Sequence, residues 1–205
     1  MPDKIGQILV TKKVITELDL NEALKRKERE PDKYLGQILC EMGLPQSKII
    51  KEIYYSNKRK QIGQILLDRN IITEAQLNNN ILQQKDLRNR GIYTPLGTLL
   101  VKNRVISEKN YMDALSAHFS IPIVSLSDYE VSPSLQKAIG EEYALKNRIV
   151  VLSNSALKVT VAMAEPHLFV FENLEKEMPK GKYILFCLAR ASEIEDCLDK
   201  KYDPY

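Results

Sequence analysis

The sequence contains no tryptophan, three cysteines and two histidines among its 205 residues. The cysteines, Cys40, Cys187 and Cys197, are odd in number and widely spaced, which excludes a disulfide-rich scaffold and a paired-cysteine metal site. Each lies in an apolar stretch, so we expect reduced, buried thiols in a cytoplasmic protein. The histidines, His118 and His167, lack the spacing of a metal site or a catalytic triad.

Further absences narrow the class of protein. No apolar run approaches the roughly 18–20 residues that a membrane span needs. The N-terminus opens directly into an amphipathic segment, so it does not resemble a secretory signal. The sequence has no phosphate-binding loop and none of the common hydrolase or metalloprotease motifs. We therefore expect no enzyme, no catalytic residue, no metal and no cofactor. With 44% apolar and 28% charged residues, the composition is that of a globular protein.

One short stretch, an aliphatic residue followed by glycine and then by a further aliphatic pair, occurs four times. The copies begin at intervals of 30, 27 and 34 residues, at Ile5, Leu35, Ile62 and Leu96. Such recurrence predicts a repeated helical unit. The varying interval argues against a tetratricopeptide scaffold, whose period is fixed at about 34 residues.

Each copy is followed by the pattern of a second helix. Eleven residues after the start stand three good N-caps and one glutamine, and Thr73 with Gln76 has the spacing of a capping box. Apolar residues then recur at i and i+4, which places both on one face of that helix. The four cap positions are Thr16, Gln46, Thr73 and Ser107, and the apolar pairs are Leu20/Leu24, Ile50/Tyr54, Leu77/Ile81 and Tyr111/Leu115.

At Ser120 the sequence pattern changes from helical repeats to a mixture of strand-like and helical segments. We expect a short extended segment over 121–124, helices over 133–140, 141–147, 167–178 and 191–201, and strands over 148–152, 157–163 and 182–188. The predicted fold is α+β: tandem helical-pair repeats followed by a small three-stranded α/β subdomain with helices on one face of its sheet. The predicted parts are a first helical repeat pair (1–58), a second pair (59–119) and the α/β subdomain (120–205).

Two features of the repeats suit an anionic ligand. Residues 51–110 contain eleven lysines and arginines against five acidic residues, a net charge of +6. Glycine at a helix start admits close approach to the backbone, where unpaired N–H groups favour phosphate oxygens. An ordinary explanation is equally open: the glycines permit close helix packing, the aliphatic residues are core, and the charge is a solvated surface.

Four stretches of the sequence resemble one family. The pattern Ile62-Gly63-x-x-Leu66-Leu67…Ile71-Ile72-Thr73…Leu77…Ile81…Gln84 resembles the MshEN motif in the N-terminal domains of type II secretion and type IV pilus ATPases, the GspE/PilB group. Residues 121–126, 159–166 and 192–202 are similar to downstream segments of that family. The resemblance implies one complete domain preceded by an additional helical copy over 1–58. The family's ATPase domain is absent from the 205 residues, so we expect either a shortened chain or a stand-alone regulatory module.

The resemblance implies cyclic di-GMP as the ligand, lying across two successive repeat units. Carried over residue by residue, the implied binding residues are Gln61, Ile62, Gly63, Leu77, Ile81, Gln84, Leu96, Gly97, Tyr111 and Leu115. The equivalent set in the first pair, an alternative site, is Lys4, Ile5, Gly6, Leu20, Leu24, Leu35, Gly36, Ile50 and Tyr54. Gln61 and Lys4 stand where the family has an arginine, which removes a planar cation from either site. Tyr54 and Tyr111 replace the usual leucine and either narrow the groove or stack on a base.

Two functional hypotheses result. The first is a non-enzymatic, cyclic di-GMP-binding regulatory module that acts on secretion or pilus machinery, through an ATPase or an inner-membrane platform component. The alternative is a ligand-free interaction module that docks on the assembly platform. Neither involves a nucleic acid polymer or membrane insertion. The missing arginine favours the second hypothesis, whereas Gln84 and the basic middle favour the first. If the second pair is the site, Gly63→Val or Gly97→Val should abolish binding with little loss of fold.

Overall fold

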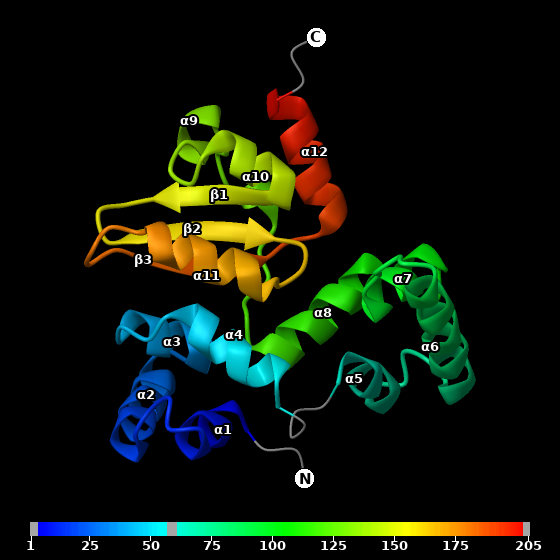
Figure 1. The fold of residues 1–205 in the computed structure, drawn as a ribbon. Coiled ribbons are helices and arrows are strands. Elements are labelled where there is room, and N and C mark those ends of the chain that lie inside the picture. Colours follow the sequence, from blue (N-terminus) through cyan, green and yellow to red (C-terminus); the bar gives the residue numbers. More distant parts are fainter. Residues whose placement is uncertain (1–3, 57–60, 203–205) are drawn as a thin grey trace.

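The computed structural model describes residues 4–56 and 61–202, and a series of helices precedes a three-stranded sheet (Figure 1). We call the helices α1–α4 the first repeat pair and α5–α8 the second. The predicted boundary between these pairs, at residues 58 and 59, lies outside the described residues. The helices are α1 (Ile5–Thr11), α2 (Glu17–Arg29), α3 (Leu35–Glu41), α4 (Gln46–Tyr54), α5 (Ile62–Asp68), α6 (Glu74–Asn89), α7 (Leu96–Lys102) and α8 (Glu108–Phe119).

The predicted starts are confirmed for the first helix of every unit and for the second helix of three units. The first helix of each unit begins at its aliphatic-glycine step, and α2, α6 and α8 follow a Thr or Ser cap. At α6 the Thr73 Oγ1 atom accepts the Gln76 N–H at 3.2 Å, while Gln76 Oε1 accepts the Thr73 N–H at 2.9 Å. These reciprocal bonds satisfy donors that a helix start otherwise leaves unpaired. The exception is α4, where Pro45 is the N-cap and Gln46 is the first helical residue.

The two repeat pairs are assembled in the same way. In the first pair α2 packs against α3 and α1 against α4, and in the second pair α6 packs against α7 and α5 against α8. Contacts between α4 and α8 join the pairs. One large apolar core includes buried side chains of every unit, among them Leu9, Ile50, Leu66 and Leu100.

The chain after α8 forms the α/β unit. Its strands lie in the order β1-β2-β3, with β1 antiparallel and β3 parallel to β2. The predicted extended segment runs beside β3, where the Val124 N–H donates to the Leu188 carbonyl at 2.8 Å. The elements are η1 (Leu126–Asp128), α9 (Pro133–Gln136), α10 (Glu141–Asn147), β1 (Ile149–Asn154), β2 (Lys158–Met163), α11 (Leu168–Glu177), β3 (Tyr183–Leu188) and α12 (Ala191–Tyr202). They match the predicted elements closely, except that α9 ends at Gln136.

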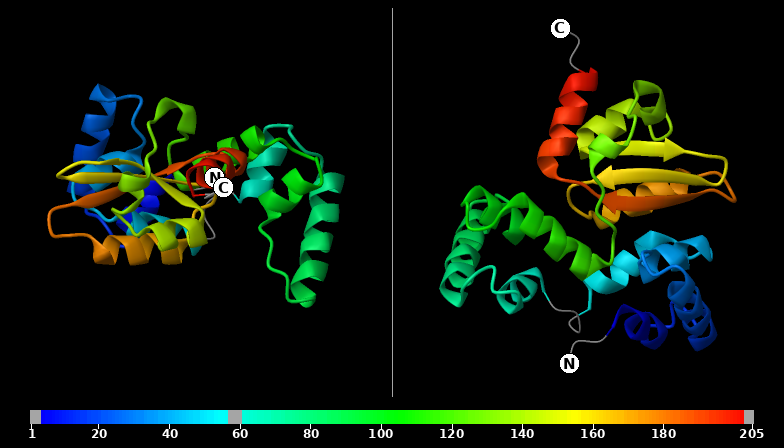
Figure 2. Two further views of the ribbon diagram at one scale, coloured as in Figure 1. Left: turned by 90° about the horizontal axis from the view of Figure 1, so that it is seen from above. Right: turned by 180° about the vertical axis from the view of Figure 1, so that it is seen from behind.

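The expectation of helices on one face of the sheet is wrong, because both faces are buried. Val151 and Val161 face the large core, to which α10, α11 and the first repeat pair contribute. Val150 and Ala162 face a second cluster that contains Ile194 of α12. The views in Figure 2 show the sheet between these layers. Strands with continuous apolar runs need burial on both faces, and that signal was present in β1.

The repeat pairs differ in how they meet the α/β unit. The first pair lies against β3 and α11, whereas the second extends away from the sheet (Figures 1 and 2). Within the described ranges, none of the helices has the length and apolar character of a membrane span. Cys40 and Cys187 are buried as expected, but Cys197 is only partly buried.

Candidate functional site

The second repeat pair brings Gly63, Leu77 and Leu96 together. A Cβ atom at Gly63 would lie 2.8 Å from Leu77 Cδ1 and 3.6 Å from Leu96 Cδ2. The glycine therefore lets the Leu77 side chain of α6 lie directly on the backbone of α5, beside the start of α7. Leu77 and Leu96 remain partly exposed, so two successive units form a small apolar contact that solvent reaches.

The equivalent contact in the first pair joins Gly6, Leu20 and Leu35. A Cβ atom at Gly6 would lie 2.5 Å from Leu20 Cδ1 and 3.4 Å from Leu35 Cδ2. The repeat thus places a leucine over the glycine twice, with the same geometry.

At Leu96-Gly97, the second aliphatic-glycine step of the second pair, the ring of Tyr111 lies directly over the glycine. A Cβ atom at Gly97 would lie only 1.9 Å from Tyr111 Cε2. Tyr111 is 6% exposed and Leu115 2%, so both side chains belong to the core. The expectation that Gly97→Val would spare the fold is therefore wrong. Burial, and then the nearby Glu165 carboxylate, raise the pKa of the Tyr111 phenol, which keeps its proton as a hydrogen-bond donor.

The loop between β2 and α11 contacts both repeat pairs. The Tyr111 hydroxyl donates to Glu165 Oε1 at 3.2 Å, and the Thr98 hydroxyl of α7 donates to the same oxygen. One residue further on, the Pro166 carbonyl accepts the Tyr54 hydroxyl of α4 at 2.7 Å. The two tyrosines that depart from the family's leucine thus anchor one loop of the α/β unit.

The remaining predicted residues of the second pair lie along α5 and α6. Ile62 and Ile81 are partly exposed, and Gln61 is exposed at the start of α5. Gln84 Nε2 donates to the Thr94 carbonyl at 2.8 Å. Gln84 therefore holds the loop that leads into α7, close to the Leu96-Gly97 step.

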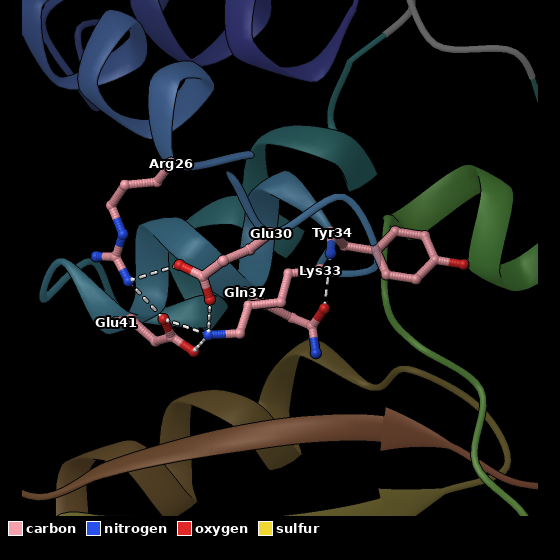
Figure 3. A network of polar contacts seen from close by, with 6 residues as sticks. All are labelled: Arg26, Glu30, Lys33, Tyr34, Gln37 and Glu41. Atoms are coloured by element: carbon pink, nitrogen blue, oxygen red, sulfur yellow. Dashed lines mark hydrogen bonds and ion pairs between the residues drawn. The ribbon is translucent and has the colours of Figure 1, made fainter. Parts of the chain in front are cut away.

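In the first pair the second glycine step is covered by backbone. A Cβ atom at Gly36 would lie 3.5 Å from the carbonyl oxygen of Ser120, the C-cap of α8. The Tyr34 hydroxyl lies 2.9 Å from Ser116 Oγ, and Figure 3 shows its ring pointing toward α8. Ile50 is fully buried. Of the remaining predicted residues here, Lys4 and Leu24 are exposed and Ile5 is buried.

The start of α4 docks on the α/β unit. Gln46 is 2% exposed, and its Oε1 atom accepts the Phe186 N–H of β3 at 2.9 Å. The Ser47 N–H donates to Glu175 Oε1 of α11 at 3.0 Å. Burial raises the pKa of the Glu175 carboxyl, although these hydrogen bonds from α4 oppose that shift. The sequence held one signal of this docking, because Gln46 is the only residue of its repeat position that is not Ser or Thr.

An ion-pair network fastens the two units of the first pair to each other (Figure 3). The Glu41 carboxylate accepts from Arg26 at 2.7 Å and from Lys33 at 2.8 Å. Glu30 pairs with the same two cations. The network joins the end of α2 to α3, so it fixes the angle at which the two units pack.

A cavity of about 410 Å³ lies between α7 and α8 on one hand and the α/β unit on the other. Its lining includes Thr98, Tyr111 and Glu165, and also Arg148, which is paired with Glu195. Among residues 4–56 and 61–202, no group of three or more His, Cys, Asp or Glu side chains is placed to hold a metal.

Residues 119–204 match the family model of the MshEN domain. The match covers the α/β unit and begins at the last residue of α8, downstream of the Ile62–Gln84 pattern. Over these residues the chain is similar to the MshEN domain family.

Two individual proteins are similar to longer parts of the chain. The chain is 28% identical over 143 residues to the type IV pilus assembly ATPase PilB of Myxococcus xanthus, covering 69% of this chain and 24% of the relative. It thus spans about a quarter of that relative's length. A solved structure described as MshE with cdg, an abbreviation of cyclic di-GMP, is 28% identical with a TM-score of 0.60, covering 70% of this chain and all of that chain.

The N-terminal domain of XpsE shares the fold, with 16% identity and a TM-score of 0.51 over 69% of this chain and 93% of that chain. The chain is accordingly related to PilB and MshE, and it shares the fold of the XpsE N-terminal domain.

Proposed function

We propose that this chain is a non-enzymatic, cyclic di-GMP-binding regulatory module and that its ligand lies on the second repeat pair. The observation that carries the proposal is the contact of Gly63, Leu77 and Leu96. Two successive units form this contact on the part of the molecule that extends away from the sheet (Figure 1). The relation to MshE, whose structure is described as containing cyclic di-GMP, supports the choice of ligand.

The covering of the glycine steps favours the second pair over the first. Gly36 faces the backbone carbonyl of Ser120, which cannot move aside without displacing the end of α8. Gly63 faces the flexible ends of Leu77 and Leu96, and Gly97 faces a side-chain ring. A ligand that spans two steps can therefore gain access to the second pair through side-chain rotation alone.

The residues around Gly63 suit the two guanines and two phosphates of cyclic di-GMP. Leu77, Ile81 and Leu96 offer apolar surface to a flat base. The exposed Gln61 amide is a neutral donor where the family has arginine. Gln61→Arg should tighten binding, because a guanidinium can pair bidentately with phosphate or stack on guanine.

The test compares two matched glycines by isothermal titration calorimetry with cyclic di-GMP, using GTP as the control ligand. Gly6→Ala and Gly63→Ala each place a methyl against a leucine Cδ1, at 2.5 and 2.8 Å, so their structural costs are similar. We expect Gly63→Ala to weaken binding and Gly6→Ala to leave it unchanged. The reverse result would place the site on the first pair, and absence of binding by the unmodified protein would refute the ligand.

A second candidate function is protein docking without a ligand. The first pair favours it, since Gln46, Ser47 and Tyr54 already bind backbone or side-chain groups of the α/β unit. The second pair would use an equivalent surface for a secretion or pilus component, either an ATPase or the cytoplasmic part of an inner-membrane platform protein. Binding to an immobilised platform domain, with no heat from cyclic di-GMP, would favour this function.

A further inference from the structure

Tyr111 is the one large ring at a position where other units of the chain use leucine. Leu20 covers Gly6 and Leu77 covers Gly63, and in the fourth unit Tyr111 covers Gly97. The leucines interact only through apolar contacts at their flexible ends. The tyrosine, in contrast, is fixed at its hydroxyl by Glu165.

Glu165 accepts hydrogen bonds from both helices of the fourth unit, α7, which contains Gly97, and α8. Its Oε1 atom accepts the Thr98 hydroxyl from α7 and the Tyr111 hydroxyl from α8. Hydrogen bonds to an ionised carboxylate are the stronger class in proteins. The Gly97 step is therefore closed by a side chain that hydrogen bonds anchor, whereas the Gly63 step is closed by a leucine held through apolar contacts alone.

The cavity beside Tyr111 provides space for the ring in another position. Tyr111, Thr98 and Glu165 all line its wall, and its volume of about 410 Å³ exceeds that of a tyrosine side chain. Met112, Ala164 and Ile194 give the same cavity an apolar surface. Rotation of the ring toward this space would uncover Gly97 and break the bond to Glu165.

We propose that Glu165 and Tyr111 form a gate on the Gly97 half of the ligand site, with Glu165 as the positioning residue that keeps Tyr111 closed. The proposal rests on the cyclic di-GMP site proposed above. A ligand that contacts both glycine steps requires the ring to leave Gly97. The free energy of breaking the hydrogen bond between Tyr111 and Glu165 therefore opposes binding. Opening also releases Thr98 and Tyr111 from the loop whose next residue, Pro166, holds Tyr54 of the first pair. Ligand binding to the second repeat pair would thereby alter the loop that the first pair contacts.

The gate is tested by calorimetry with cyclic di-GMP on the full chain and three variants. Glu165→Ala removes the anchor, and Tyr111→Leu restores the residue that the first and third units use. We expect both to tighten binding by about tenfold, the scale of one lost hydrogen bond to a charged group. Ser155→Ala removes an exposed hydroxyl that bonds within the turn between β1 and β2 and does not line the cavity, so the affinity of this variant should equal that of the unmodified chain. A structural role alone would weaken binding or leave it unchanged, not tighten it.

Filling the cavity gives an opposite expectation. Ala191 lines the cavity at the start of α12, and Ala191→Leu should obstruct the ring. We expect weaker binding for Ala191→Leu, and no such loss when it is combined with Tyr111→Leu. If the unmodified chain binds and Glu165→Ala and Tyr111→Leu match its affinity, the gate is wrong while the ligand site stands. If no variant binds cyclic di-GMP, both the site and its gate are refuted.

Discussion

The side-chain Oε1 of Gln46 and the backbone N–H of Phe186 form a 2.9 Å hydrogen bond between residues 140 positions apart. Gln136 does the same at the opposite edge of the sheet, accepting the Val151 N–H at 2.9 Å and donating to its carbonyl at 3.1 Å. Both glutamines are buried. Two side-chain amides therefore occupy main-chain groups on the outer strands, which would otherwise be open to pairing with another chain.

Loss of the Gln46 amide should destabilise the protein. Gln46→Ala leaves the Phe186 N–H buried without its acceptor, which costs about 1–3 kcal/mol. Urea denaturation measures the change. Gln7→Ala, at an exposed position of α1, serves as the control and should stay within about 0.5 kcal/mol of the unmodified protein. Equal losses for the two variants would contradict the role of Gln46.

Two glycines at the same repeat position should respond differently to alanine. Gly97→Ala drives a methyl into the Tyr111 ring and should cost about 1–3 kcal/mol, as overpacking does. Gly36→Ala meets nothing closer than 3.5 Å and should be neutral, or stabilising by up to about 1 kcal/mol through helix propensity. Thermal and urea unfolding of the two variants test this order, and a larger loss at Gly36 would refute the packing described.

The network around Glu41 should contribute modestly and in a salt-dependent way. Glu41→Gln weakens pairing with Arg26 and Lys33 and should cost about 1 kcal/mol at low salt. The difference should shrink at about 1 M NaCl, where the Debye length falls to about 3 Å. Asp113→Asn breaks the 3.6 Å pair with Lys109, an exposed i,i+4 contact, and should have a smaller effect. A salt-independent loss at Glu41 would indicate packing instead of charge.

Glu175 should make stability depend on pH. Burial raises its folded-state pKa above the usual 4.5, so its favourable contribution is complete below that value and is lost as the pH rises through the folded-state pKa. Glu175→Gln keeps an oxygen for the Ser47 N–H and removes the charge. The variant should therefore gain stability relative to the unmodified protein between about pH 4 and about pH 7. The test compares the urea midpoints of the variant and the unmodified protein at the two pH values. A difference between the two proteins that does not change with pH would contradict the cost of burying the carboxylate.

Local signals predicted the elements of this fold. Thr16, Thr73 and Ser107 mark helix starts because their hydroxyls satisfy N–H groups only a few residues away. The strands and their order along the chain followed from apolar runs separated by turns. The continuous apolar run of β1 indicated that both sheet faces are buried, but a pattern within one segment does not say which distant segment packs on each face.

The same limit applies to the site. The i, i+4 spacing correctly puts Tyr111 and Leu115 on one face of α8, but it does not say that this face is core. Glu165 carries no signal in its own neighbourhood, because its partners Thr98 and Tyr111 lie 67 and 54 positions away. Its role depends on how the repeat helices meet the loop between β2 and α11, which only the three-dimensional arrangement reveals.

The docking of α4 on β3 has a consequence for synthesis on the ribosome. Helices α1–α4 emerge first, yet the strand that receives Gln46 is among the last segments to be translated. Ser47 likewise waits for Glu175, 128 positions later. The nascent N-terminal helices therefore expose an unfilled docking face until β3 forms, a period in which chaperones have the greatest opportunity to bind it.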